Sequence, residues 1–114
     1  MASCLFCSIA AGDIPCTEVF ADDRFLAFRD IDPKAPSHIL VIPRRHIPSL
    51  DALQDGDTQL AGELVVLATK IARDEGLAEK GYRFVVNSGE EGGQTVDHIH
   101  LHILGGRSLG WPPG

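Results

Sequence analysis

The chain has little positive charge and no long apolar run. Its ten lysine and arginine residues stand against sixteen acidic residues, which gives a formal net charge of -6. Nucleic-acid-binding proteins usually display a basic patch, so this balance argues against nucleic acid as a partner and leaves room only for a small anion in a local pocket. No segment reaches the roughly 18 consecutive apolar residues of a membrane span. We therefore expect a protein that binds neither nucleic acid nor membrane.

Cysteine is also scarce. The three cysteines are an odd number and do not form a disulfide framework, while 44% hydrophobic content is enough for one core without covalent staples. The opening residues MASCLFCSIAAGD lack the basic segment and the apolar run of a secretory signal. We therefore expect a cytoplasmic protein with reduced thiols, in which Cys4 and Cys7 are better suited to a metal half-site than to a crosslink. Cys16 is expected to be a bystander.

The chain contains one long amphipathic pattern among several short strand patterns. No repeat or composition break divides it, so we expect one domain over residues 1–114. Leucine and isoleucine recur at helical spacing from Leu60 and predict a helix over 58–75, with Asp57 as N-cap and Gly76 just beyond its end. Ser3 and Gly12 bound a short predicted N-terminal helix. Strands are predicted at 18–20, 25–29, 38–43, 82–87 and 97–104. Short connections between them favour an antiparallel α+β domain over a parallel fold.

All five histidines fall in two apolar segments. His38 and His46 bracket the sequence ILVIPRR, and His98, His100 and His102 alternate with aliphatic residues in HIHLHIL. Successive side chains of a strand point to opposite faces, so the three alternating histidines are expected to share one face. A merely solvated strand face does not require three imidazoles, each about 7 Å from the next.

Two chemistries use such a row of histidines. One is a zinc hydrolase in which all three imidazoles bind the metal and activate water. The other is catalysis at phosphorus, in which one imidazole attacks and its neighbours hold the phosphoryl oxygens and supply a proton. The preceding loop, 88–95, favours the second chemistry. Its glycines permit close approach of a ligand, and Gln94 and Thr95 offer donors to an anionic oxygen, although such a loop alone is more often only a turn.

The sequence HIHLHIL matches the H-φ-H-φ-H-φ-φ pattern, with φ hydrophobic, that names the histidine-triad (HIT) superfamily, and the resemblance covers nearly the whole chain. The Hint branch is the most similar. Its further matches are Asp30-Ile31 before APSH, the run 39–43, Asn87, the sequence GGQT at 92–95, and the ending from LGGR to WPPG. The WPPG tail separates the sequence from the fragile-histidine-triad branch, which cleaves dinucleoside polyphosphates, and from the galactose-1-phosphate uridylyltransferases.

The resemblance implies a HIT fold, which is a five-stranded antiparallel sheet with one long and one or two short helices, assembled as a homodimer. It also implies hydrolysis of nucleoside 5'-phosphoramidates or aminoacyl adenylates, with purines preferred and no cofactor required for catalysis. By the same resemblance His100 is the nucleophile that forms a nucleotidyl-histidine intermediate, and His102 contacts the phosphate and transfers a proton. His38 and His98 complete the imidazole cluster. The implied nucleotide contacts are Phe28 and Ile31 at the base, Asp30 at the ribose, Asn87, Gly93, Gln94 and Thr95 at ribose or phosphate, and Trp111 in a tail that reaches the partner subunit near its site.

The spacing of Cys4 and Cys7 is that of a zinc half-site. By the resemblance, His46 and His98 complete a structural zinc site. The alternative is that the two cysteines only line one turn of a partly buried helix. Because alternation points His98 the same way as His100, a zinc ligand at 98 has to twist away from the catalytic cluster or lie at its edge.

Two other functions stay open at the level of sequence. One is a nucleotide-binding regulatory module whose catalysis is vestigial, and the other is a dinucleoside polyphosphate hydrolase. The sequence does not identify the physiological leaving group, because a pocket that recognises ribose, base and phosphate leaves that group largely uncontacted.

Overall fold

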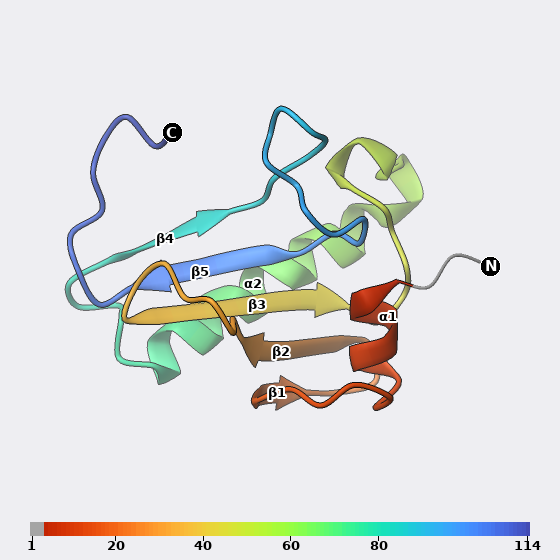
Figure 1. Cartoon of the computed structure of the whole chain (residues 1–114), viewed down its shortest axis with the longest axis horizontal. Coiled ribbons are helices and arrows are strands. Elements are labelled where there is room, and N and C mark those ends of the chain that lie inside the picture. The colour runs from red at the N-terminus through yellow and green to blue at the C-terminus, as the bar shows by residue number, and fades with distance from the viewer. Residues whose placement is uncertain (1–3) are drawn as a thin grey trace.

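A five-stranded antiparallel sheet with the strand order β1-β2-β3-β5-β4 organises the chain (Figure 1). The computed structural model describes residues 4–114. The elements are α1 (Leu5–Ala10), β1 (Glu18–Ala21), β2 (Phe25–Arg29), β3 (Ser37–Pro43), the 3-10 turns η1 (Leu50–Ala52) and η2 (Asp55–Asp57), α2 (Thr58–Asp74), β4 (Tyr82–Val85) and β5 (Leu101–Gly105). The predicted α+β class, with an antiparallel sheet and one long helix, is confirmed. None of the helices in the described part of the chain is long and apolar enough to cross a membrane.

Helix α2 covers one face of the sheet. Its buried stripe packs against the inward side chains of the central strands, and this core includes Leu60, Leu64, Ala68, Ile71, Ile39, Val41, Leu101 and Ile103. Gly76, with a φ of 77°, follows the helix end as predicted, because glycine takes this backbone conformation without steric cost. Asp57 is the N-cap residue, but its carboxylate accepts the Gln54 N–H at 3.0 Å and pairs with Arg45 instead of capping α2.

The opposite face of the sheet carries imidazoles. The pairing of β3 with β5 sets Leu40 opposite His102 and His38 opposite Leu104. Strand β4 then sets Val85 on the other side of His102. Directly paired residues of neighbouring strands share a face, and so do residues two apart on one strand. His102 therefore shares a face with Leu40 and with His38, and this is the face away from α2.

The last strand is shorter than the sequence predicts. Strand β5 begins at Leu101, so His98 and His100 lie in an irregular segment before it. There the His98 N–H donates to the Val96 carbonyl at 2.8 Å, and the Ile99 N–H donates to the Ile47 carbonyl at 2.7 Å. The expectation of one strand over 97–104 carrying all three histidines is therefore wrong, because this backbone bonds to the segment after β3 instead of continuing the ladder. Strand β4 likewise ends at Val85, two residues before the predicted end.

Helix α1 lies at the end of β3, beside the imidazole face (Figure 1). Its N-cap is Cys4, whose Sγ accepts the Cys7 N–H at 3.4 Å. The predicted cap, Ser3, lies outside the described residues. Phe6 is the buried residue of the helix and belongs to a second core cluster with Leu26, Phe28, Leu40 and Ile42. The helix is thus fixed to the sheet next to the histidine row.

Candidate functional site

A hollow of about 470 Å³ lies on the imidazole face of the sheet. Seven residues that the sequence singles out line it, namely Asp30, His38, Asn87, Gly93, Thr95, His100 and His102. Four further lining residues were not predicted from the sequence. They are Asp32 and Lys34 from the loop before β3, Val85 from β4 and Leu104 from β5. The alternation of β4 and β5 could have found the last two, because they share a face with His102.

Four of the expected nucleotide contacts lie outside this hollow, namely Phe28, Ile31, Gln94 and Trp111. Phe28 is buried in the second core, with its ring centroid 5.5 Å from that of Phe6. Ile31 is fully exposed, and Trp111 is 82% exposed in the C-terminal tail. Their roles toward a nucleotide stay predictions.

Gln94 also lies outside the hollow, and its side chain braces the loop that precedes the histidines. Its Oε1 accepts the Gly89 N–H at 2.9 Å, and its Nε2 donates to the carbonyls of Pro48 and Val96 at 2.7 and 3.0 Å. All polar atoms of this amide are therefore engaged within the protein. The neighbouring Thr95 and Gly93 are left as the loop residues that line the hollow.

The backbone fixes the tautomer of His100. Its Nδ1 lies 2.7 Å from the carbonyl oxygen of His98. A carbonyl oxygen can only accept, so Nδ1 carries the proton and donates it. The neutral ring then has its lone pair on Nε2. His100 is 4% exposed and lines the hollow, and its Nε2 has the electron pair that a nucleophile needs.

A second chain of hydrogen bonds fixes His38 and His102. The Nδ1 of His38 accepts the Lys34 backbone N–H at 3.0 Å, so the neutral ring carries its proton on Nε2. This Nε2 donates to the Nδ1 of His102 at 2.9 Å and also lies 3.4 Å from the Asp30 carboxylate. His102 therefore keeps its own proton on Nε2. That nitrogen is buried and has no hydrogen-bond partner among the described residues. Buried polar groups are normally hydrogen-bonded, so this N–H is available to donate to an oxygen atom of a ligand in the hollow.

Burial keeps this second chain neutral. Loss of hydration, reinforced by the neighbouring His100 and His38 rings, lowers the pKa of His102 to about 4. Burial also lowers the pKa of His38, although the Asp30 carboxylate opposes the shift. Both rings are neutral near pH 7, as the direction of the hydrogen bonds requires.

Cys4, Cys7, His46 and His98 form a separate cluster at the edge of the site. One donor atom from each lies within 4.8 Å of the others. The Sγ atoms of Cys4 and Cys7 lie 3.4 and 3.5 Å from the Nδ1 of His98, and the two imidazole Nδ1 atoms are 3.3 Å apart. Separations of about 3.3–3.5 Å are those expected between ligands held 2.0–2.3 Å from a tetrahedral zinc ion.

The protonation of this cluster also suits a metal. The Nε2 of His98 donates to the Pro43 carbonyl at 2.7 Å, which leaves a lone pair on the Nδ1 that faces the thiols. Burial and the adjacent Cys4 thiol raise the pKa of Cys7, and a bound cation would reverse this by stabilising the thiolate. Two thiolates and two imidazoles are a zinc donor set with no position left for water or substrate.

The other histidine groupings fit a metal poorly. His98 turns its free nitrogen toward the cysteines, so His98, His100 and His102 do not converge on one ion. Asp30, His38 and His102 do bring donor atoms together. However, the lone pair of His38 Nδ1 is already used by the Lys34 N–H, and its Nε2 carries the proton that it shares with His102. These three residues are therefore a hydrogen-bond chain and not a ligand set.

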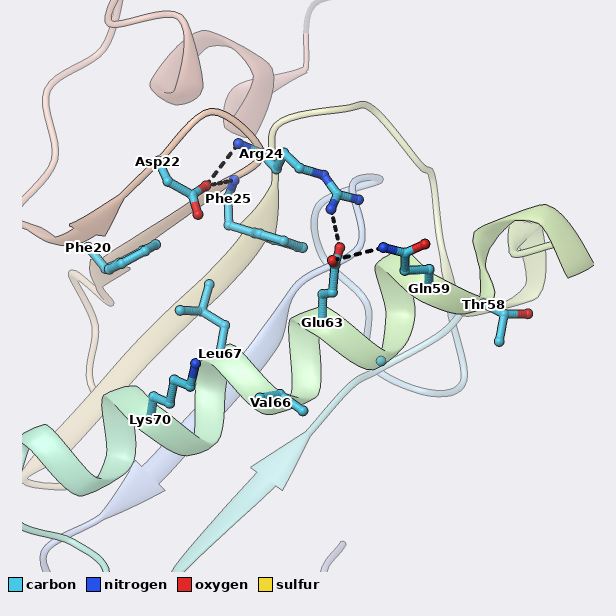
Figure 2. A pocket seen from close by; sticks show the side chains of 11 residues that line it. Phe20, Asp22, Arg24, Phe25, Thr58, Gln59, Glu63, Val66, Leu67 and Lys70 are labelled. Carbon is cyan, nitrogen blue, oxygen red and sulfur yellow. Dashed lines mark hydrogen bonds and ion pairs between the residues drawn. The ribbon is translucent and has the colours of Figure 1, made fainter.

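A second hollow, of about 560 Å³, lies on the other side of the sheet, between the β1–β2 hairpin and α2 (Figure 2). Phe20 and Phe25 face Val66 and Leu67 across it, and Arg24 is paired with Glu63 at one end. No imidazole or thiol is among the residues that line it. Although this hollow is larger, the groups that can do chemistry lie on the opposite face.

Comparisons with known proteins agree with this geometry. The HIT domain profile matches residues 11–109. An uncharacterised HIT-like protein of Synechococcus elongatus is 51% identical over 110 residues, which are 96% of each chain. The crystal structure of a HIT family hydrolase from Legionella pneumophila is 54% identical, with a TM-score of 0.97 over 98% of this chain and 100% of that one. A histidine triad nucleotide-binding protein from Candida albicans is 30% identical, with a TM-score of 0.82 over 96% of this chain and 83% of that one.

Proposed function

The chain belongs to the HIT domain family, and on that premise we propose that it hydrolyses nucleoside 5'-phosphoramidates or aminoacyl adenylates through a covalent intermediate on His100. The observation that carries this proposal is that an unprotonated imidazole nitrogen and a protonated one lie side by side in the hollow. His100 offers a lone pair on Nε2. Its neighbour His102, with ring centroids 4.9 Å apart, offers a buried N–H that has no partner within residues 4–114. A nucleophile beside a proton donor is the arrangement that phosphoryl substitution requires.

In the proposed reaction the Nε2 of His100 attacks phosphorus and the bond from phosphorus to the leaving group breaks. The amine or carboxylate leaves. An amine takes the proton from Nε2 of His102, and the water that attacks in the next step returns a proton to that nitrogen. Water then attacks the phosphorus of the nucleotidyl-histidine, which releases a nucleoside monophosphate and restores the imidazole. Charge on the phosphoryl oxygens is met by the His102 N–H and the Thr95 hydroxyl, because the N–H groups of Gly93 and Gln94 already donate within the loop.

Recognition of the nucleotide is assigned to the rim of the hollow. The Oδ1 of Asp30 accepts the Asp32 N–H at 2.8 Å, which holds the carboxylate in place to accept the ribose hydroxyls. Asn87 lies on the other side of the hollow and has a side-chain amide that suits ribose or phosphate. The exposed Ile31 and the tail residue Trp111 supply apolar surface outside it, against which we expect a purine base to pack. A HIT family hydrolase and a histidine triad nucleotide-binding protein are among the structural relatives, which supports this assignment.

A turnover screen with the purified full-length chain tests the proposal. The substrates are adenosine and guanosine 5'-phosphoramidates, aminoacyl adenylates and dinucleoside polyphosphates. We expect release of AMP or GMP from the first two classes at rates well above those for the third. Faster cleavage of dinucleoside polyphosphates would show instead that the chain is a dinucleoside polyphosphate hydrolase. Tight nucleotide binding without turnover of any substrate would make the chain a nucleotide-binding module.

We also propose that Cys4, Cys7, His46 and His98 hold a structural zinc ion. The ligand separations and the free Nδ1 of His98 support this assignment. Metal analysis of protein purified without chelator should give one zinc per chain, and a Cys4→Ser, Cys7→Ser double variant should have none. A metal-free parent whose two thiols react freely with a labelling reagent would rule it out.

The homodimer is proposed from the open edge of the sheet. Among the strands of the described residues, β4 pairs only with β5, which leaves its other edge for a second copy. Tyr82 and Phe84 are half-buried on the helix side of this strand, and Val65 of α2 is 49% exposed. On the other side, Arg83 donates to the Gly110 carbonyl at 2.8 Å and holds the tail along β4. Association of two chains at this edge would bring the tail bearing Trp111 next to the partner.

A further inference from the structure

The metal cluster and the nucleophile share one residue. The side chain of His98 belongs to the cluster through Nδ1, while its main-chain carbonyl accepts the proton of His100 Nδ1 at 2.7 Å. His98 is completely buried and is held at every polar group, because its Nε2 donates to Pro43 and its N–H donates to Val96. The orientation of the carbonyl that sets the tautomer of His100 therefore depends on how this single residue is anchored.

The other end of the same peptide group is anchored beside a second member of the cluster. The carbonyl of His98 and the N–H of Ile99 form one planar unit. That N–H donates at 2.7 Å to the carbonyl of Ile47, which directly follows His46. Residues 98–99 lie before the start of β5, so no ladder bond holds this peptide. The contact between His46 and His98 and the bond from Ile99 to Ile47 are thus two parallel links between the same two segments.

Helix α1 gives a third route from the cluster to the nucleophile. Cys4 is its N-cap and Cys7 lies in its first turn, and Phe6 directly precedes Cys7 in the sequence. The ring of Phe6 meets the His100 ring edge-on, with centroids 5.0 Å apart and an interplanar angle of 88°, and lies 6.0 Å from the His98 ring. Helix α1 has only six residues, so its position depends on its packing and on its cysteines.

We propose that the cluster of Cys4, Cys7, His46 and His98, when it holds a metal, is a positioning device for His100. Metal ligation fixes residue 98, the 46–47 segment and α1 against one another. The His98 carbonyl then sets the tautomer of His100, the bond from Ile99 to Ile47 holds that carbonyl in place, and Phe6 of α1 sets the plane of the His100 ring. His98 acts as a positioning residue, since its imidazole lies outside the substrate hollow. Loss of the metal should therefore lower the rate of the covalent step and leave nucleotide recognition at Asp30 and Asn87 intact.

The test compares the zinc-loaded full chain with two variants and one control. Cys4→Ser, Cys7→Ser removes both thiolates but keeps an N-cap hydroxyl for α1. His46→Ala removes one exposed ligand, and Cys16→Ser is the matched control outside the cluster. Both cluster variants should lower kcat on an adenosine phosphoramidate by roughly tenfold to a hundredfold, as loss of supporting contacts around a ligand typically does. KM should stay within about threefold, because binding contacts persist. The control should match the parent.

A second readout does not depend on turnover. In protein with 15N-labelled histidine rings, the zinc-loaded chain should show His100 as a single neutral tautomer with the proton on Nδ1. Removing zinc with a chelator should broaden this signal or mix the two tautomers, and returning zinc should restore it. The same cycle should leave the His38 signal unchanged, since the Lys34 N–H fixes that ring independently.

Three outcomes would overturn the proposal: a parent that binds no metal, a metal-free chain whose His100 signal is unmoved, or folded cluster variants with the parent's kcat. If the double variant fails to fold, His46→Ala and chelation of the parent still decide the question. The kcat measurements rest on the proposed function, whereas the 15N signals of the histidine rings do not depend on it. A parent without turnover whose His100 signal still follows zinc would leave the coupling intact and refute only the assigned reaction.

Discussion

The Nε2 of His38 lies 2.9 Å from the Nδ1 of His102, and the direction of this hydrogen bond is set from outside the pair by the backbone N–H of Lys34. Because that amide occupies His38 Nδ1, His38 must donate and His102 must accept. The proton of His102 is thereby placed on Nε2, the nitrogen for which the described part of the chain offers no partner. One backbone amide thus determines where the site keeps its transferable proton.

Replacing His38 by Ala should slow turnover without removing it. His102 would lose the donor at Nδ1, so both of its neutral tautomers become populated and only one presents a proton to the leaving group. We expect kcat on a phosphoramidate to fall by about one to two orders of magnitude, within the range for general acid catalysis. Lys34→Ala keeps the backbone N–H and is the matched control, with kcat close to the parent's. Equal losses in the two variants would show that the loop, and not the imidazole, matters.

The free energy of unfolding should fall as the pH drops from neutral toward 4. The pKa of His102 in the folded chain is about 4, below its ordinary value of 6.5. Between these values the unfolded chain binds more protons than the folded one, so stability rises with pH and is lost on acidification. Burial shifts His38 and His98 in the same direction. Denaturant titrations across this interval measure the slope. His102→Gln should have a shallower slope than the parent, and an identical slope in both would refute the assigned protonation state.

Gly92 should tolerate no side chain. A Cβ at this position would lie 2.5 Å from the Ser88 carbonyl oxygen, which is closer than real contacts. Gly92→Ala therefore has to displace the backbone of the loop that holds Gly93 and Thr95, and kcat/KM should fall. In contrast, a Cβ at Gly62 meets nothing within 4 Å.

Gly62→Ala is therefore the control, and it also carries a prediction of its own. Gly62 lies inside α2, where alanine is favoured over glycine by roughly 0.5–1 kcal/mol, so the variant should be more stable and fully active. Thermal unfolding and steady-state kinetics of the two variants check both expectations. Unchanged kcat/KM in Gly92→Ala would contradict the role assigned to this loop.

Deleting residues 109–114 should change the relative rates among substrates more than nucleotide affinity. In the proposed dimer this tail, held by Arg83 and carrying Trp111, lies near the leaving-group side of the partner's hollow. Relative kcat/KM values for phosphoramidates with small and large amines measure the effect. A uniform loss on all substrates would argue instead for a purely structural tail.

Much of this architecture can be predicted from local patterns. The period of helix α2, its ends at Asp57 and Gly76, and the shared face of His38 and His102 follow from side-chain spacing. The misplaced elements depend on contacts between segments far apart in the chain. The bond from Ile99 to Ile47 takes His98 out of the strand, and the bonds of Gln94 to Pro48 and Val96 engage an amide that spacing alone left free for a ligand. Strand periodicity carries no information about such contacts.

Trapping the intermediate tests the central claim most directly. The chain is mixed with an adenosine phosphoramidate, quenched within a single turnover under conditions that preserve phosphorus–nitrogen bonds, digested and examined by mass spectrometry, with His100→Ala as the control. We expect one adenylyl group on the peptide that contains His100, with fragment ions that place it on that residue, and no adduct in the control. Full turnover by His100→Ala, or an adduct on His98 or His102 in the parent, would contradict it.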